Sequence, residues 1–248
     1  MIFERSLHPD WTSNTYLLGD AEGGTGVFVD AGGPIEALVE AVGRHRLRPT
    51  HVLLTHHHHD HVAELEGLRR RYGGIAILAD PLEAEHVEGV TGVLADGDTL
   101  ALGGLRIHAI ATPGHSAGML SFVVDDAELF TGDTLFRGSV GGVRAPGSTS
   151  YDDLRRSVME RLMVLPHGLR IRPGHTDPTT VGEEWESNPF VRIWRGVDPE
   201  GDEPCTAFGE PARLVLLARD YDGGHKAWVR WPDGRDDIVP GSQVQRTA

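Results

Sequence analysis

The 248-residue sequence contains one cysteine, Cys205. A single cysteine excludes an intramolecular disulfide framework and a zinc cluster built on thiolates. No apolar run approaches the ~20 residues that a membrane-spanning helix needs, and the opening segment MIFERSLHPD has no apolar core of the kind found in secretory signals. We therefore expect a cytoplasmic protein that makes no contact with a membrane.

Positive charge is also scarce. The chain has 23 Lys and Arg residues against 37 Asp and Glu residues, which gives a formal net charge of −14. Such a charge repels the phosphates of nucleic acids and of anionic lipids, so we expect neither class of partner. The 32 glycines and 15 prolines indicate many turns, although their share stays below that of low-complexity sequence.

Strand and helix patterns alternate along the first two thirds of the chain. Apolar stretches typical of buried strands cover residues 26–30, 51–54 and 75–79, and apolar residues at helical spacing follow the first two of them. Further strand patterns cover 105–111, 119–124, 128–131 and 169–172, and helical patterns cover 151–165 and 181–195. Ser150 is the expected N-cap of the first of these helices, and a break is expected near Pro189 in the second. This alternation favours an α/β fold in which helices cover sheets.

The end of the chain follows a different pattern. Residues 196–209, GVDPEGDEPCTAFG, are acidic and contain Gly and Pro, which predicts a linker between a main domain (1–195) and a small β-rich appendage (210–248). Three strand patterns joined by Asp-Gly turns lie at 213–218, 226–231 and 235–239, and the appendage loosely resembles a small SH3-like barrel. Because about 40 residues rarely form a stable core alone, we expect it to dock on the main domain or to form a homodimer contact.

The most informative segment is a run of histidines placed where a predicted strand ends. It reads Thr55-His56-His57-His58-His59-Asp60-His61. Along an extended segment, His56 and His58 point to one side while His57 and His59 point to the other. Neutral imidazoles and a carboxylate are the ligands that a borderline metal such as zinc prefers. The run therefore predicts a metal site, in which His57 and His59 face solvent or support the ligands.

Three further turns each place one possible ligand after a predicted strand. His115 follows Thr-Pro-Gly, Asp133 lies in Thr-Gly-Asp-Thr, and His175 follows Pro-Gly. The glycines allow the backbone to approach closely at each turn. A single Pro-Gly-His is usually only a turn, but the four elements in this order are hard to assign to chance.

These motifs resemble the metallo-β-lactamase superfamily, whose H-x-H-x-D-H motif matches His56, His58, Asp60 and His61. The resemblance covers about residues 12–195 and implies an αββα sandwich, with two mixed sheets packed between helices. Within the superfamily the chain most resembles glyoxalase II-like hydrolases, the hydroxyacylglutathione hydrolases, through the motifs THHHHDH, TPGHSAG, LFTGDTLF and PGHTDPTTVGEEWESNPF.

The resemblance also implies the roles of the site residues. Two metal ions are implied, zinc or alternatively iron or manganese. The implied ligands are His56, His58 and His115 for the first metal, Asp60, His61 and His175 for the second, and Asp133 as the bridge. Asp60 and Asp133 are the catalytic carboxylates in this scheme, and a hydroxide bridging the metals attacks a small thioester or ester substrate. A thiolate leaving group needs no strong general acid, because its pKa lies near 8.5.

Other functions remain open at this stage. Persulfide dioxygenases resemble the same motifs but use one iron, for which the matching residues are His56, His115 and Asp133. Lactonases share the full ligand set. A non-enzymatic role, with a vestigial metal site and an interacting appendage, is a further alternative.

The identity of the thiol carried by the substrate is a separate question. Full-length glyoxalase II grips glutathione through a C-terminal helical domain, and this chain has a β-rich appendage there instead. A net charge of −14 matches an anionic thiol poorly unless Arg137, Arg144 or Arg192 supplies a local positive patch.

Overall fold

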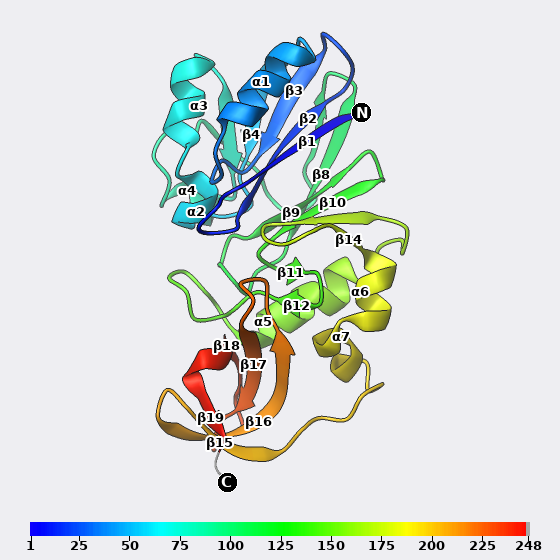
Figure 1. Ribbon diagram of the computed structural model, residues 1–248. Coiled ribbons are helices and arrows are strands. Elements are labelled where there is room, and N and C mark those ends of the chain that lie inside the picture. The colour runs from blue at the N-terminus through cyan, green and yellow to red at the C-terminus, as the bar shows by residue number, and fades with distance from the viewer. Residues whose placement is uncertain (247–248) are drawn as a thin grey trace.

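The computed structural model describes residues 1–246 and contains two six-stranded sheets that pack face to face (Figure 1). The first sheet has the order β1-β2-β3-β4-β5-β6. Its strands are β1 (Ile2–Leu7), β2 (Asn14–Gly19), β3 (Thr25–Val29), β4 (Arg48–Leu53), β5 (Ala76–Ala79) and β6 (Gly92–Val93). Strands β1 to β3 pair antiparallel and β3 to β6 pair parallel, so the sheet is mixed.

The second sheet has the order β14-β13-β10-β9-β8-β7 and is also mixed, because β10 and β13 pair parallel. Its strands are β7 (Thr99–Leu102), β8 (Leu105–Ala111), β9 (Leu120–Val124), β10 (Glu128–Gly132), β13 (Arg170–Pro173) and β14 (Thr179–Thr180). A short ribbon of β11 (Leu135–Phe136) and β12 (Ser139–Val140) follows β10. The predicted strand 105–111 is confirmed at both ends.

Helices cover the outer face of each sheet (Figure 1). The helices are α1 (Glu36–Arg44), α2 (His59–Val62), α3 (Leu65–Arg71), α4 (Pro81–Ala84), α5 (Tyr151–Arg156) with a π-helical continuation (Ser157–Leu162), α6 (Val181–Ser187) and α7 (Pro189–Trp194). The predicted cap is confirmed, since Ser150 Oγ accepts a hydrogen bond from the Asp153 backbone N–H. The predicted break is confirmed as well, because Asn188 caps a new helix that begins at Pro189. Within residues 1–246 no helix is both long and apolar enough to cross a bilayer.

The core explains why these layers form. Side chains alternate between the two faces of a strand, so Leu17 of β2 packs under α1 while its neighbour Leu18 packs between the sheets. Phe28 and Val29 of β3 divide in the same way. The expected αββα sandwich of two mixed sheets between helices is therefore confirmed.

The last part of the described chain forms a third sheet with the order β18-β17-β16-β15-β19. Its strands are β15 (Glu203–Ala207), β16 (Glu210–Arg219), β17 (His225–Arg230), β18 (Asp236–Pro240) and β19 (Val244–Arg246). Residues 203–207 were expected in a linker, and that expectation was wrong: they form β15, which pairs with both β16 and β19. Although the segment has linker-like composition, Cys205 and Ala207 alternate with more exposed residues and bury their side chains in the sheet.

This third sheet packs tightly against the main body. Trp228 of β17 is 2% exposed, and its ring lies 5.1 Å from that of Tyr151 and 6.3 Å from that of Trp194. Lys226, two residues earlier, donates a hydrogen bond to the Val140 carbonyl at 2.9 Å. The sheet and α5 to α7 therefore share one apolar core.

We predict that Trp228→Ala lowers the free energy of unfolding by about 3–5 kcal/mol, because it leaves a large cavity in this shared core. Denaturant unfolding followed by circular dichroism measures the loss. Trp11→Ala is the matched control: its side chain is 39% exposed, and the expected cost is about 1 kcal/mol or less. A separate early transition in Trp228→Ala, with the main transition unchanged, would show that the sheet unfolds independently.

Candidate metal centre

The candidate site lies where four loops meet at the ends of strands from both sheets. The run after β4 supplies four side chains, and α2 begins within it at His59. The turns after β8, β10 and β13 supply His115, Asp133 and His175. Every one of the seven predicted residues therefore reaches the same place.

Two glycines make this approach possible. A Cβ on Gly174 would lie 2.1 Å from the Asp133 carboxylate, so a larger residue beside His175 would displace that side chain. Gly132 has a φ of +47°, and a Cβ there would lie 2.7 Å from Thr55 and Met119. The Pro-Gly-His and Thr-Gly-Asp motifs thus have a steric cause.

The donor atoms of the seven residues form three overlapping groups, in each of which all donors lie within 4.8 Å of one another. The groups are His56, His58 and His115; His56, His61 and Asp133; and Asp60, His61 and His175. The first and last contain the two sets of side chains that the sequence assigns to two metals. The middle group shares His56 with the first and His61 with the last, and it adds Asp133.

Two imidazoles in the first group, those of His58 and His115, direct ring nitrogens toward each other. His115 Nδ1 donates to the Gly142 carbonyl at 2.8 Å, and His58 Nε2 donates to the Pro146 carbonyl at 2.9 Å. In the neutral rings, the remaining nitrogens, His115 Nε2 and His58 Nδ1, therefore carry lone pairs. These two nitrogens lie only 2.9 Å apart. Because two lone pairs repel each other, the geometry fits a cation bound between them.

Unpaired polar atoms give the same indication. Among the described residues, the buried atoms without a hydrogen-bond partner include His56 Nε2, His61 Nε2 and Asp133 Oδ1. His61 Nε2 lies 3.3 Å from Asp133 Oδ1, but without the angles of a hydrogen bond. Buried polar atoms are costly unless something binds them. The residues present therefore fit a metal ion.

Burial and charge divide the site into two electrostatic halves. Burial lowers the pKa of His115 to about 4 and holds the pKa of His56 well below its ordinary value. Burial also opposes charge on the other side, but there the Asp133 carboxylate raises the pKa of His175 to about 9 and the pKa of His61 well above its ordinary value. One half of the site thus presents neutral imidazoles. In the other half the Asp133 carboxylate favours positive charge on its neighbours, and the same carboxylate would attract a divalent cation.

Further side chains, which no sequence motif marks, hold this arrangement in place. Asp30 accepts hydrogen bonds from the Thr55 N–H at 2.8 Å and from His61 Nδ1 at 2.9 Å, which turns His61 Nε2 toward the other donors. Its signal in the sequence was weak: like the other site residues, it follows an apolar strand and precedes glycines.

Glu83 gave no signal in the sequence. Its buried carboxylate accepts hydrogen bonds from the backbone N–H groups of His57 and Gly118, each at 2.8 Å, and also contacts the His57 ring. His59 instead contacts the Trp11 ring at a centroid distance of 5.1 Å. Neither His57 nor His59 belongs to the three donor groups.

The third sheet also reaches the site. The Tyr221 ring stacks on the His175 ring at a centroid distance of 4.1 Å and an angle of 14°. Its Asp-Gly-Gly neighbours indicated only a hairpin turn, so the sequence gave no reason to place it here. A cavity of about 690 Å³ is lined by His115 and Asp133 on one side and by residues of this sheet on the other.

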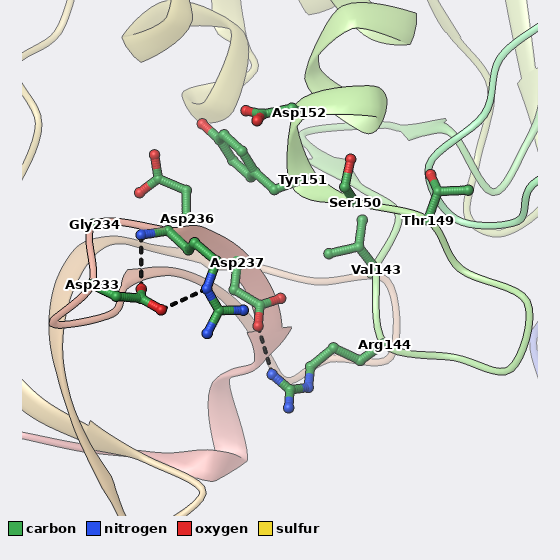
Figure 2. Close-up of a pocket in the computed structure, with 11 residues that line it drawn as sticks. Val143, Arg144, Thr149, Ser150, Tyr151, Asp152, Asp233, Gly234, Asp236 and Asp237 are labelled. Atoms are coloured by element: carbon green, nitrogen blue, oxygen red, sulfur yellow. Dashed lines mark hydrogen bonds and ion pairs between the residues drawn. The ribbon is translucent and has the colours of Figure 1, made fainter.

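A second hollow, of about 650 Å³, lies where the third sheet meets the start of α5 (Figure 2). Several aspartates line it, together with Arg144, which points toward Asp237 and is bonded to it at 2.5 Å (Figure 2). Its lining includes none of the seven residues of the candidate site. The candidate site therefore adjoins the first cavity and not this hollow.

Comparison with known proteins agrees with this architecture. The model of the "Metallo-beta-lactamase superfamily" matches residues 8–175. A hydroxyacylglutathione hydrolase from Rhizobium johnstonii is 32% identical over 238 residues, covering 78% of this chain and 90% of that protein. A probable polyketide biosynthesis zinc-dependent hydrolase, BaeB, from Bacillus velezensis is 30% identical over 185 residues, covering 74% and 81%.

Solved structures show the same relationship. ETHE1 from Myxococcus xanthus superposes with a TM-score of 0.69 at 27% identity, covering 77% of this chain and 84% of that one. TTHA1623 in a di-iron-bound form superposes with a TM-score of 0.64 at 32% identity, covering 75% and 98%. The fold, the clustered histidines and aspartates, and these similarities lead to one conclusion: the chain belongs to the metallo-β-lactamase superfamily.

Proposed function

We propose that the protein is a binuclear metal-dependent hydrolase that cleaves a small thioester or ester. The observation that carries the proposal is the chain of three overlapping donor groups, whose middle group contains Asp133 and shares His56 with one neighbour and His61 with the other. A single metal would use one such group and leave the buried imidazoles and carboxylates of another uncompensated. The similarity to relatives named as hydrolases supports the same reaction class.

In this proposal His56, His58 and His115 would hold one metal, Asp60, His61 and His175 would hold the other, and Asp133 would contribute to both. Such metals would supply a bound water with a pKa of about 7 and would polarise the substrate carbonyl. Zinc is the proposed metal, since BaeB is named as zinc-dependent. Iron is the alternative, because TTHA1623 is described in a di-iron-bound form.

The chain's own residues keep the site ordered for this reaction. His115 and His58 are oriented by backbone carbonyls, and His61 by Asp30. Burial, together with Asp133 and Asp220, raises the pKa of Tyr221, so its phenol stays protonated beside His175. A thioester suits this site because a thiolate can leave without a strong general acid.

We predict that the purified protein binds two metals per chain, and that Asp133→Ala binds fewer and loses at least about 100-fold in kcat/KM. Loss of a bridging ligand should exceed the 10–100-fold effect typical of residues that only orient ligands. Elemental analysis and hydrolysis of a thioester such as lactoylglutathione measure both quantities. One iron per chain, with persulfide-dependent oxygen uptake and no thioester cleavage, would instead identify a dioxygenase that uses His56, His115 and Asp133.

Asp30→Asn should weaken metal binding by about 10–100-fold, because an amide cannot match the carboxylate that orients His61. Competition with a chromogenic chelator measures the affinity. Asp20→Asn is the matched control, since Asp20 only accepts backbone hydrogen bonds in a distant turn. Equal affinities in the two variants would show that Asp30 has no influence on metal binding.

Removal of metal should also destabilise the fold. A ligand present at 1,000 times its Kd stabilises by about 4 kcal/mol, which corresponds to roughly 8–16 °C in Tm for a chain of this size. We therefore expect a chelator to lower Tm by about 10 °C and added zinc to restore it, as measured by scanning calorimetry. An unchanged Tm would mean that the clustered side chains bind no metal tightly.

A further inference from the structure

The cavity beside the candidate metal centre has two unlike sides. His115 and Asp133 lie on one side, and three parts of the third sheet form the other: the turn at Phe208, the turn at 220–226, and β18. The candidate metal centre and the third sheet therefore line the same cavity, and the αββα body does not supply that part of the lining. This wall determines what the rest of the substrate can be.

We propose that this cavity binds an aliphatic group of medium length carried by the thioester or ester, and that the third sheet thereby selects the substrate. The inference rests on the hydrolase function proposed above and adds the substrate class to it. The apolar side chains on the lining include Phe136, Phe208, Tyr221, Ile238, Val239 and Pro240. A volume of about 690 Å³ lies in the range of pockets that enclose a small organic ligand.

The charges on the lining exclude a strongly anionic ligand. Lys226 pairs with Asp220 at 3.0 Å and Arg144 bonds to Asp237 at 2.5 Å. Both cations of the lining are thus already compensated, and Asp222 adds a further negative charge. Arg192, another candidate for a positive patch, bonds to Asp198. A thiol with two carboxylates, such as glutathione, finds no uncompensated Lys or Arg on this lining.

Phe208 provides an independent indication. Ala207 pairs with Glu210, so Phe208 and Gly209 form a two-residue hairpin turn. Both have positive φ, +51° and +82°, a geometry in which Asn-Gly is strongly preferred. A bulky aromatic residue is disfavoured there, and this one is also 46% exposed. The turn does not explain Phe208; its ring carries the Arg144 guanidinium, whose carbon lies 4.6 Å from the ring centroid, and it stands on the rim of the cavity.

Two series of thioesters test the proposal on the full-length, metal-loaded protein. The first varies the acyl group from acetyl to octanoyl on one thiol, N-acetylcysteamine; the second varies the thiol from ethanethiol to octanethiol on one acetyl group. We expect kcat/KM to rise about fourfold per methylene in one series, the factor that burial of a methylene produces. That series identifies whether the acyl or the thiol side enters the cavity. Turnover that is independent of length in both series would overturn the proposal.

Phe208→Asn distinguishes an effect on substrate binding from an effect on the stability of the fold. Asparagine suits the turn better than phenylalanine, so Tm should stay the same or rise. The octanoyl or octanethiol substrate should lose about tenfold in kcat/KM, while the shortest substrate changes less than about twofold. Val164→Asn is the control, because Val164 is an exposed apolar residue away from the cavity. An equal loss for short and long substrates would contradict a role in chain recognition.

A binding measurement keeps this inference distinct from the proposed reaction. Calorimetric titration with octanoate and with acetate requires no turnover. We expect octanoate to bind at least 100-fold more tightly, and Phe208→Asn to reduce that preference. If no thioester is cleaved but octanoate is preferred, the hydrolase proposal fails and the apolar cavity stands. If thioesters are cleaved and the two acids bind equally, the hydrolase proposal stands and the apolar cavity fails.

Discussion

The structure depends above all on the close approach of four loops around Asp133. Donor atoms from these loops gather in groups no wider than 4.8 Å. At this spacing a Cβ on Gly132 or Gly174 would collide with neighbouring side chains. Glycines beside the ligands relieve the steric part of the problem. The electrostatic part remains, because buried imidazoles and carboxylates need compensation. Two sheets must therefore be rigidly packed for the site to exist.

That rigidity comes from the apolar layer between the sheets and reaches the ligands through a few polar contacts. Asp30 directly follows β3 and accepts hydrogen bonds from both Thr55 and His61. Glu83, after β5, binds the backbone on two sides of the site. These carboxylates are not in the donor groups. Their hydrogen bonds fix the histidine segment relative to the strands of the first sheet. A site built in this way tolerates little movement of the strands beneath it.

Local patterns predicted an α/β fold with possible ligands after several strands, and the resemblance to the metallo-β-lactamase superfamily implied the sandwich and the set of seven residues. Strand and helix patterns are local, and each candidate ligand directly follows a strand, so the parallel and antiparallel pairing brings them together. Contacts between distant segments leave no local pattern. Tyr221 stacks on His175 across the interface with the third sheet, and β15 looked like a linker because its burial depends on strands that come later in the chain. The role of the seven residues as metal ligands stays a prediction.

The third sheet joins stability to the shape of the cavity. Residues two apart on a strand share a face, and on β17 that face carries both Trp228, packed against Tyr151, and Lys226, bound to the Val140 carbonyl. Lys226 also pairs with Asp220, which accepts a hydrogen bond from Ser139. The turn that holds Tyr221 over His175 is thus fixed by the same strand that fills the shared core. A change that loosens the docking of this sheet also moves residues that line the cavity, so packing of the shared core and the shape of the cavity depend on the same strand.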